Sequence, residues 1–174
     1  MPNYRRAFIP GGTFFLTSVT RDRRPILVDP LYRNALAEAI RSTQRHLPFA
    51  CIAIVLLPDH WHIILTLPPG DADFSRRMHA IKRQAILRSR RRSLWQKRFW
   101  ERTVCNEKEF VRLVDYIHYN PVKHGHASCP HDWPFSSFHR FVREGTYLQD
   151  WGCSCRGRRV CRPDNTSLAT LVGE

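Results

Sequence analysis

Two histidines that are one residue apart, His60 and His62, are the residues of this chain best suited to chemistry. They lie in the apolar segment 50–67, and Trp61 separates them. Alternate side chains of a β-strand point to the same face, so both imidazoles would project together. Neutral imidazole nitrogen is a common ligand of divalent metals. The spacing indicates either half of a metal site or a pair of histidines with purely structural hydrogen bonds.

A tyrosine and an asparagine further along the chain could complete such a site. Four apolar residues have the i, i+3, i+4, i+7 spacing of a buried helical stripe: Phe110, Leu113, Val114 and Ile117. At about 100° per residue, Tyr116 and Asn120 fall together on one flank of this stripe, whereas Tyr119 points away from it. Tyr116 either packs at the edge of the core with its hydroxyl satisfied, or faces a cleft between this helix and a sheet.

One reaction requires the side-chain types of these four residues: His60, His62, Tyr116 and Asn120. Two imidazoles and a side-chain carbonyl can bind a divalent cation, and a phenol can attack a phosphorus that the cation polarises. A phenol has a pKa of about 10 and is a weak nucleophile at neutral pH, so it needs such help.

Two motifs carry a resemblance to a known family. Leu57-Pro-Asp-His-Trp-His62 resembles the His-hydrophobic-His motif of the HUH single-strand DNA nucleases. Tyr116-Ile-His-Tyr-Asn-Pro-Val-Lys-His-Gly125 resembles the tyrosine-helix signature of their single-tyrosine transposase branch. Residues 4–6, 11–15 and 133–138 are similar to the opening and closing segments of the REP-associated tyrosine transposases, relatives of insertion-sequence transposases. The resemblance covers residues 4–145 and excludes the tail after Trp151.

The resemblance implies an enzyme that cleaves single-stranded DNA near hairpins, with Mg²⁺ or Mn²⁺ as cofactor. Cleavage would leave a 5′-phosphotyrosine and a free 3′-hydroxyl, and reversal would join strands. Carried onto this chain, the family roles make Tyr116 the nucleophile, His60 and His62 metal ligands, and Asn120 the third ligand. The sequence does not single out a role for His118 or His124.

An excess of positive charge predicts a polyanionic partner. The chain has 28 lysine and arginine residues against 15 acidic residues, a net charge of +13. We expect DNA contacts from basic residues near the N-terminus, in a central segment and after the tyrosine: Arg5, Arg6, Lys82, Arg83, Arg90, Arg91, Arg92, Lys97, Arg98 and Lys123. Trp95, Phe99 and Trp100 would serve as stacking platforms between them. The alternative is a solvated charged face.

The elements that must position these residues form an α+β domain. We expect strands at 13–20, 50–57, 61–67 and 98–104, and helices at 30–47, 73–90 and 106–120, the last ended by Pro121. The order is the ferredoxin-like β-α-β-β-α-β arrangement with an added C-terminal helix that bears the tyrosine. The helices are expected on one face of the antiparallel sheet.

We divide the chain into a nuclease domain at 1–145 and a basic, cysteine-containing tail at 146–174, expected to pack loosely. The apolar runs are shorter than the roughly 20 residues that span a bilayer, and no secretory signal precedes them. We therefore predict a cytoplasmic protein, a monomer or homodimer with no membrane partner, whose six cysteines are thiols. The spacing of Cys153, Cys155 and Cys161 matches no zinc motif.

Two other functions fit parts of the pattern. A noncatalytic nucleic-acid-binding module could use the same ferredoxin-like sheet, although the aromatic signature of RNA-recognition domains is absent. A metal-dependent hydrolase could use the same histidines with water as its nucleophile.

Overall fold

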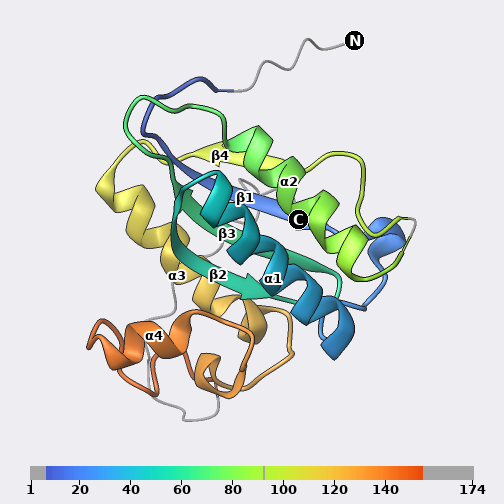
Figure 1. The fold of residues 1–174 in the computed structure, drawn as a ribbon. Helices are drawn as coiled ribbons and strands as arrows, with labels where there is room; N and C mark the ends of the chain where they lie inside the picture. The colour runs from blue at the N-terminus through green and yellow to red at the C-terminus, as the bar shows by residue number, and fades with distance from the viewer. Residues whose placement is uncertain (1–6, 92, 155–174) are drawn as a thin grey trace.

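The computed structural model describes residues 7–91 and 93–154, and its elements follow the predicted order (Figure 1). The four strands are β1 (Thr13–Val19), β2 (Ala50–Leu56), β3 (His60–Thr66) and β4 (Trp100–Thr103). The helices are α1 (Pro30–His46), α2 (Phe74–Arg88), α3 (Glu107–Lys123) and α4 (Phe138–Arg143), with short 3₁₀ turns at Arg21–Arg23 and Pro130–Asp132. The strands form one antiparallel sheet in the order β2-β3-β1-β4. This order confirms the predicted ferredoxin-like fold.

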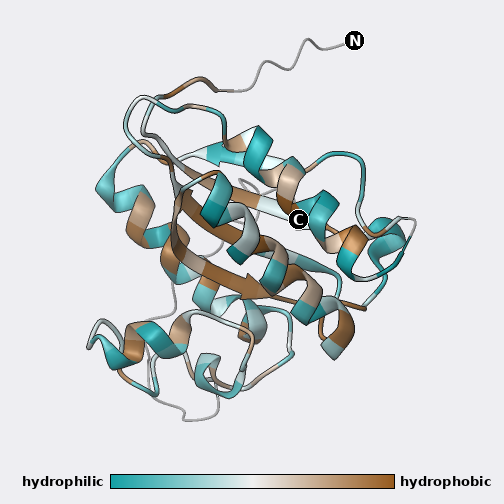
Figure 2. Cartoon of the chain, viewed as in Figure 1, coloured by the Kyte–Doolittle hydropathy of each residue, from teal (hydrophilic) through white to brown (hydrophobic). Residues whose placement is uncertain are grey.

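The sheet buries apolar side chains on both of its faces. Its strands include long hydrophobic stretches, coloured brown in Figure 2. Trp61, Ile63 and Leu65 of β3 pack with α1 and α2, whereas Ile64 packs on the opposite side with α3. The prediction of helices on one face is therefore confirmed for α1 and α2 and wrong for α3. β3 is buried almost throughout, which is the behaviour of a strand with a layer on each side. By alternation, His60 and His62 share the face that α3 covers.

Helix α3 begins at a capped end and passes through a proline. The side chain of Asn106 accepts a hydrogen bond from the backbone N–H of Glu109 at 2.9 Å, which caps the N-terminus. The predicted end at Asn120 was wrong, because the helix continues through Pro121 to Lys123. Proline removes one helical hydrogen bond, but the N–H of His124 still reaches the carbonyl of Asn120 at 3.0 Å. Lys123 therefore lies two turns after Tyr116 on the same side of the helix.

Residues 146–154 pack against α3 and α4, so the prediction of a loosely packed tail was wrong for this part. The Tyr147 ring stacks on Phe138 with centroids 5.4 Å apart and lies 4.5 Å from Trp151. The Tyr147 hydroxyl donates a hydrogen bond to Asp115, which precedes Tyr116 in α3. The remainder of the predicted tail, 155–174, lies outside the described residues.

Cys129 and Cys153 form a disulfide, which corrects the prediction of thiols for this pair. It connects the loop after α3 to the segment after α4. Cys51 and Cys105 are free cysteines, and burial raises the pKa of the Cys51 thiol to about 11. Cys155 and Cys161 lie outside the described residues. Within the described part of the chain, no helix is long and apolar enough to cross a membrane.

Candidate active site

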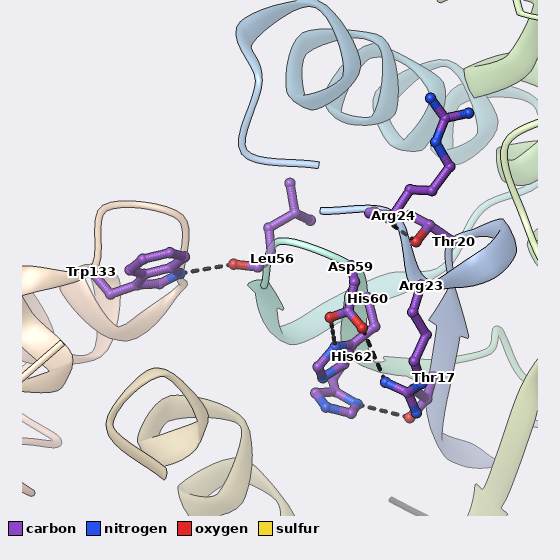
Figure 3. Close-up of polar contacts among 9 residues, drawn as sticks. All are labelled: Thr17, Thr20, Arg23, Arg24, Leu56, Asp59, His60, His62 and Trp133. Atoms are coloured by element: carbon purple, nitrogen blue, oxygen red, sulfur yellow. Dashed lines mark hydrogen bonds and ion pairs between the residues drawn. The ribbon is translucent and has the colours of Figure 1, made fainter. Parts of the chain in front are cut away.

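The two histidines of β3 lie side by side (Figure 3), and His62 contacts the Tyr116 ring of α3. His62 is fully buried and His60 nearly so. Their ring centroids are 4.9 Å apart and the rings are almost perpendicular. The strand therefore holds two imidazoles side by side on one face, the arrangement that their spacing predicts.

Each imidazole is held at Nδ1 by a neighbouring side chain (Figure 3). The Asp59 carboxylate is 2.6 Å from Nδ1 of His60, and the Thr17 hydroxyl is 2.7 Å from Nδ1 of His62. Arg23 donates to the same carboxylate at 3.0 Å. Such outer contacts fix the tautomer and ring orientation of a metal-binding histidine and direct Nε2 toward the metal.

The pKa of Asp59 reflects this arrangement. Burial raises the pKa of the carboxyl, but the hydrogen bonds and charges of His60 and Arg23 outweigh burial and lower it. The carboxylate is therefore ionised at neutral pH and can accept a hydrogen bond from the Nδ1–H of His60.

Sequence reasoning missed both supporting residues. Asp59 directly precedes His60 in the sequence, so its contact with this histidine could have been predicted. Thr17 is the cross-strand partner of His62 in the β1–β3 pairing. That register is set by packing of the whole sheet, and the separate strand patterns do not reveal it.

Tyr116 reaches the same layer from α3. Its ring is fully buried, 5.6 Å from His62 and 5.9 Å from Phe15 between centroids. Lys123 donates a hydrogen bond from Nζ to Oη of Tyr116 at 3.2 Å, and the ammonium lies 4.9 Å from the ring centroid. The phenol oxygen thus has a cation beside it, in a layer that also contains the histidine pair.

Asn120, one turn after Tyr116, is also fully buried. Within the described residues, its side-chain Oδ1 and Nδ2 make no hydrogen bond. Burial of such an amide costs free energy unless another group replaces the hydrogen bonds that it made with water. A cation that took Oδ1 as a ligand would satisfy the acceptor, so the residues fit a divalent metal. Among the described residues, no three or more His, Cys, Asp or Glu are grouped to hold a metal ion.

The sequence of this chain is similar to those of known transposases. Residues 13–120 match the family model described as "Transposase IS200 like". The REP-associated tyrosine transposase of Escherichia coli (strain K12) is 47% identical over 151 residues, which cover 87% of this chain and 91% of that protein.

The chain belongs to the REP-associated tyrosine transposases.

Two further relatives support the assignment to this family. A protein from Haemophilus influenzae is 40% identical over 167 residues, covering 87% of this chain and 94% of its own length. A solved structure of the REP-associated tyrosine transposase bound to a REP hairpin has a TM-score of 0.83 and 44% sequence identity. The match covers 92% of this chain and 96% of the chain in that structure. The predicted family and fold are therefore confirmed.

In this member of the family, a row of rings borders the histidine pair. The His124 ring is 5.4 Å from His60, His126 stacks 6.2 Å from His124, and Trp133 stacks 5.5 Å from His126. Partial burial and the neighbouring His124 lower the pKa of His126. The sequence did not distinguish His124 from its neighbours, because its proximity to His60 depends on how α3 crosses the sheet.

The predicted DNA-binding residues divide into three groups. Five are exposed, as a DNA contact requires: Arg83, Arg90, Arg91, Lys97 and Arg98. Arg5, Arg6 and Arg92 lie outside the described residues. Lys82 and Lys123 make internal contacts, and so does the exposed Arg91, whose Nε donates to the Tyr32 hydroxyl at 2.6 Å.

Lys82 is buried, and its Nζ donates to the backbone carbonyl of Gln96 at 2.7 Å. The prediction that Lys82 faces DNA is corrected: in this structure the ammonium ties the segment before β4 to α2. The stacking platforms are also corrected, because Trp95 and Phe99 are core residues and Trp100 is half-buried against Phe15. Their spacing matches burial in the core equally well, so the sequence did not separate the two roles.

His118 has a structural role in α3 and gives a testable pH dependence. It is fully buried and hydrogen-bonded to Ser137 Oγ at 2.8 Å. Burial, and then the charge of Arg140, lower its pKa from 6.5 to about 3. The unfolded chain binds this proton near pH 6.5 and the folded protein only near pH 3. Its contribution to stability is therefore complete above pH 6.5 and lost as the pH falls.

We expect acidification from pH 7.5 to pH 5 to cost the wild type about 2 kcal/mol more than His118→Gln, at 1.36 kcal/mol per pKa unit. Urea unfolding at the two pH values measures this difference. His46→Gln, which alters an exposed histidine of α1, serves as the control and should behave as wild type. Equal pH dependence of wild type and His118→Gln would contradict the assignment.

Proposed function

We propose that this transposase cleaves and rejoins single-stranded DNA at hairpins through a covalent 5′-phosphotyrosine on Tyr116. The observation that carries the proposal is the Tyr116 ring, 5.6 Å from His62 in the same buried layer. A hairpin as substrate is supported by the related structure, whose protein is bound to a REP hairpin. The exposed arginines and the net charge of +13 suit a DNA backbone.

His60, His62 and Asn120 would hold the Mg²⁺ or Mn²⁺ ion. When bound, the ion would offset negative charge on the non-bridging oxygens of the scissile phosphate. Asp59 and Thr17 keep the two imidazoles oriented for this task through their Nδ1 contacts.

Cleavage by the phenol is a balanced exchange of one ester for another. Oη of Tyr116 forms a bond to phosphorus, and the bond from phosphorus to the 3′-oxygen breaks. The phenol proton passes to water, and the departing 3′-oxygen takes up a proton to become a hydroxyl. The phosphotyrosine keeps one ester bond in place of another, so a 3′-hydroxyl can attack it and join strands without an energy-supplying cofactor.

A hairpin oligonucleotide with a single-stranded flank and a label at its 3′ end tests the proposal. With Mn²⁺ or Mg²⁺, the label is expected to migrate with the protein on a denaturing gel. A free 5′-phosphate with no protein-linked DNA at any time would indicate hydrolysis by water instead. Hairpin binding without cleavage in any metal would indicate a noncatalytic binding module.

The hydrogen bond between Thr17 and His62 gives a second prediction. Thr17→Val keeps the shape of the side chain but removes the hydroxyl that orients the imidazole. Loss of such an outer contact typically lowers metal affinity about 10- to 100-fold. A calorimetric titration with Mn²⁺ measures the change in metal affinity. Thr13→Val, which removes a hydroxyl paired with Thr66 at the other end of β1, should bind Mn²⁺ as wild type does. If both variants bind Mn²⁺ equally, Thr17 has no role in the site.

A further inference from the structure

We infer that Lys123 is a catalytic residue, whose ammonium stabilises the negative charge on Oη of Tyr116 when the phosphotyrosine forms and when it is broken. The inference rests on the proposed function and adds a residue to it. From the sequence, Lys123 was expected to contact DNA, and its position was also compatible with proton transfer.

The contact between the two side chains is direct. Nζ of Lys123 donates to Oη of Tyr116 at 3.2 Å and lies 4.9 Å from the centre of its ring. The ammonium therefore touches the atom that would bond to phosphorus. Lys123 is half-buried and Tyr116 fully buried, so water screens the contact less than it would on the surface.

The helix itself creates this contact. Because α3 continues through Pro121, Lys123 lies seven residues, and about two turns, after Tyr116. Helical side chains lean toward the N-terminus, so the lysine side chain extends back along the helix toward the phenol. Gly125, with φ of 70°, then turns the chain away from the helix axis two residues after Lys123. A helix that ended at Asn120 would not hold the lysine in this position.

The charge on Oη changes most in the joining direction. A 3′-hydroxyl attacks the phosphotyrosine, the bond from phosphorus to Oη breaks, and Oη leaves with the bonding electron pair. A cationic donor already directed at that oxygen stabilises the developing charge. Cleavage passes through the same transition state in reverse, so the same contact lowers its barrier. The proton on the attacking 3′-hydroxyl goes to water, and Tyr116 regains its proton from water.

The alternative role, a contact with a DNA phosphate, predicts a different result. A phosphate contact supplies affinity, and its loss weakens binding and reduces the salt dependence of binding. It does not change the rate at saturating DNA. A donor to the reacting oxygen acts mainly on the rate, because that oxygen gains its charge only during reaction.

The test compares Lys123→Met, which keeps the length but removes the charge, with Lys123→Arg and the control Lys108→Met. Lys108 is exposed in the first turn of α3. Single-turnover rates of adduct formation are measured at saturating hairpin, and joining is measured by adding a 3′-hydroxyl strand to purified adduct. Hairpin affinity is measured separately in EDTA, where no reaction occurs.

We expect Lys123→Met to slow cleavage and joining each by roughly 10²- to 10³-fold, the typical effect of removing one donor to a developing oxyanion. Its hairpin affinity in EDTA should stay near that of the wild type, which also shows that the variant is folded. Lys123→Arg should recover most of both rates, and Lys108→Met should match the wild type.

Unchanged rates at saturation with weakened affinity would overturn the inference and make Lys123 a DNA contact. So would a loss confined to one direction of the reaction, or failure of Lys123→Arg to recover either rate. These results are distinguishable from failure of the proposed function. In that case the wild type forms no adduct, or Tyr116→Phe forms it as readily as the wild type.

Discussion

Replacing Tyr116 by phenylalanine is expected to abolish covalent capture of DNA while leaving hairpin binding intact. The substitution removes a single oxygen. The ring keeps its packing against His62 and Phe15, and the lost hydrogen bond from Lys123 costs about 1 kcal/mol of stability. The variant should therefore fold and bind, but no other atom at that position can form the ester with phosphorus. Denaturing gels measure the adduct, and fluorescence anisotropy measures binding.

Tyr119→Phe is the matched control for this substitution. Tyr119 lies on the same helix, three residues after Tyr116, half-buried with its ring 6.4 Å from Trp151. Because it faces the aromatic cluster after α4 and not the histidine pair, the variant should form adduct at the wild-type rate. The nucleophile is misassigned if the Tyr119 variant loses the adduct and the Tyr116 variant keeps it.

The second large effect is expected from His62→Leu, which fills a similar volume without a ligand atom. A metal contributes several kcal/mol to charge stabilisation at phosphorus, and each 1.36 kcal/mol is tenfold in rate. We therefore expect adduct formation to fall by roughly 10³-fold or more. Mn²⁺ binding measured by calorimetry should weaken in parallel, whereas hairpin binding in EDTA should persist.

His79→Leu removes an exposed histidine of α2 and should leave both Mn²⁺ affinity and rate unchanged. The metal assignment fails if His62→Leu binds Mn²⁺ with wild-type affinity. It also fails if wild-type cleavage proceeds undiminished in EDTA.

Local periodicity was enough to predict the main parts of the site. The alternation of a strand placed His60 and His62 on one face, and the period of a helix placed Tyr116 and Asn120 on one flank. Both patterns depend only on backbone geometry, so they can be read without knowing the tertiary structure. The order of elements likewise gave the ferredoxin-like fold.

Features that depend on tertiary packing could not be predicted from the sequence. Thr17 reaches His62 through strand register, and Lys82 turns inward to a carbonyl that belongs to a segment 14 residues later. The proline rule placed the end of α3 one turn early, because the helix tolerates the single missing donor at Pro121. The disulfide between Cys129 and Cys153 required knowledge of how the chain after α4 returns to α3.

The most direct test of the central claim is to map the covalent bond by mass spectrometry. The wild type is reacted with a hairpin oligonucleotide and Mn²⁺, the DNA is trimmed with nuclease, and the protein is digested with trypsin. The peptide of residues 113–123 contains both Tyr116 and Tyr119, so fragmentation must locate the added mass. We predict a nucleotide joined through its 5′-phosphate to Tyr116. A nucleotide on any other residue, or cleaved DNA with an unmodified peptide, would contradict it.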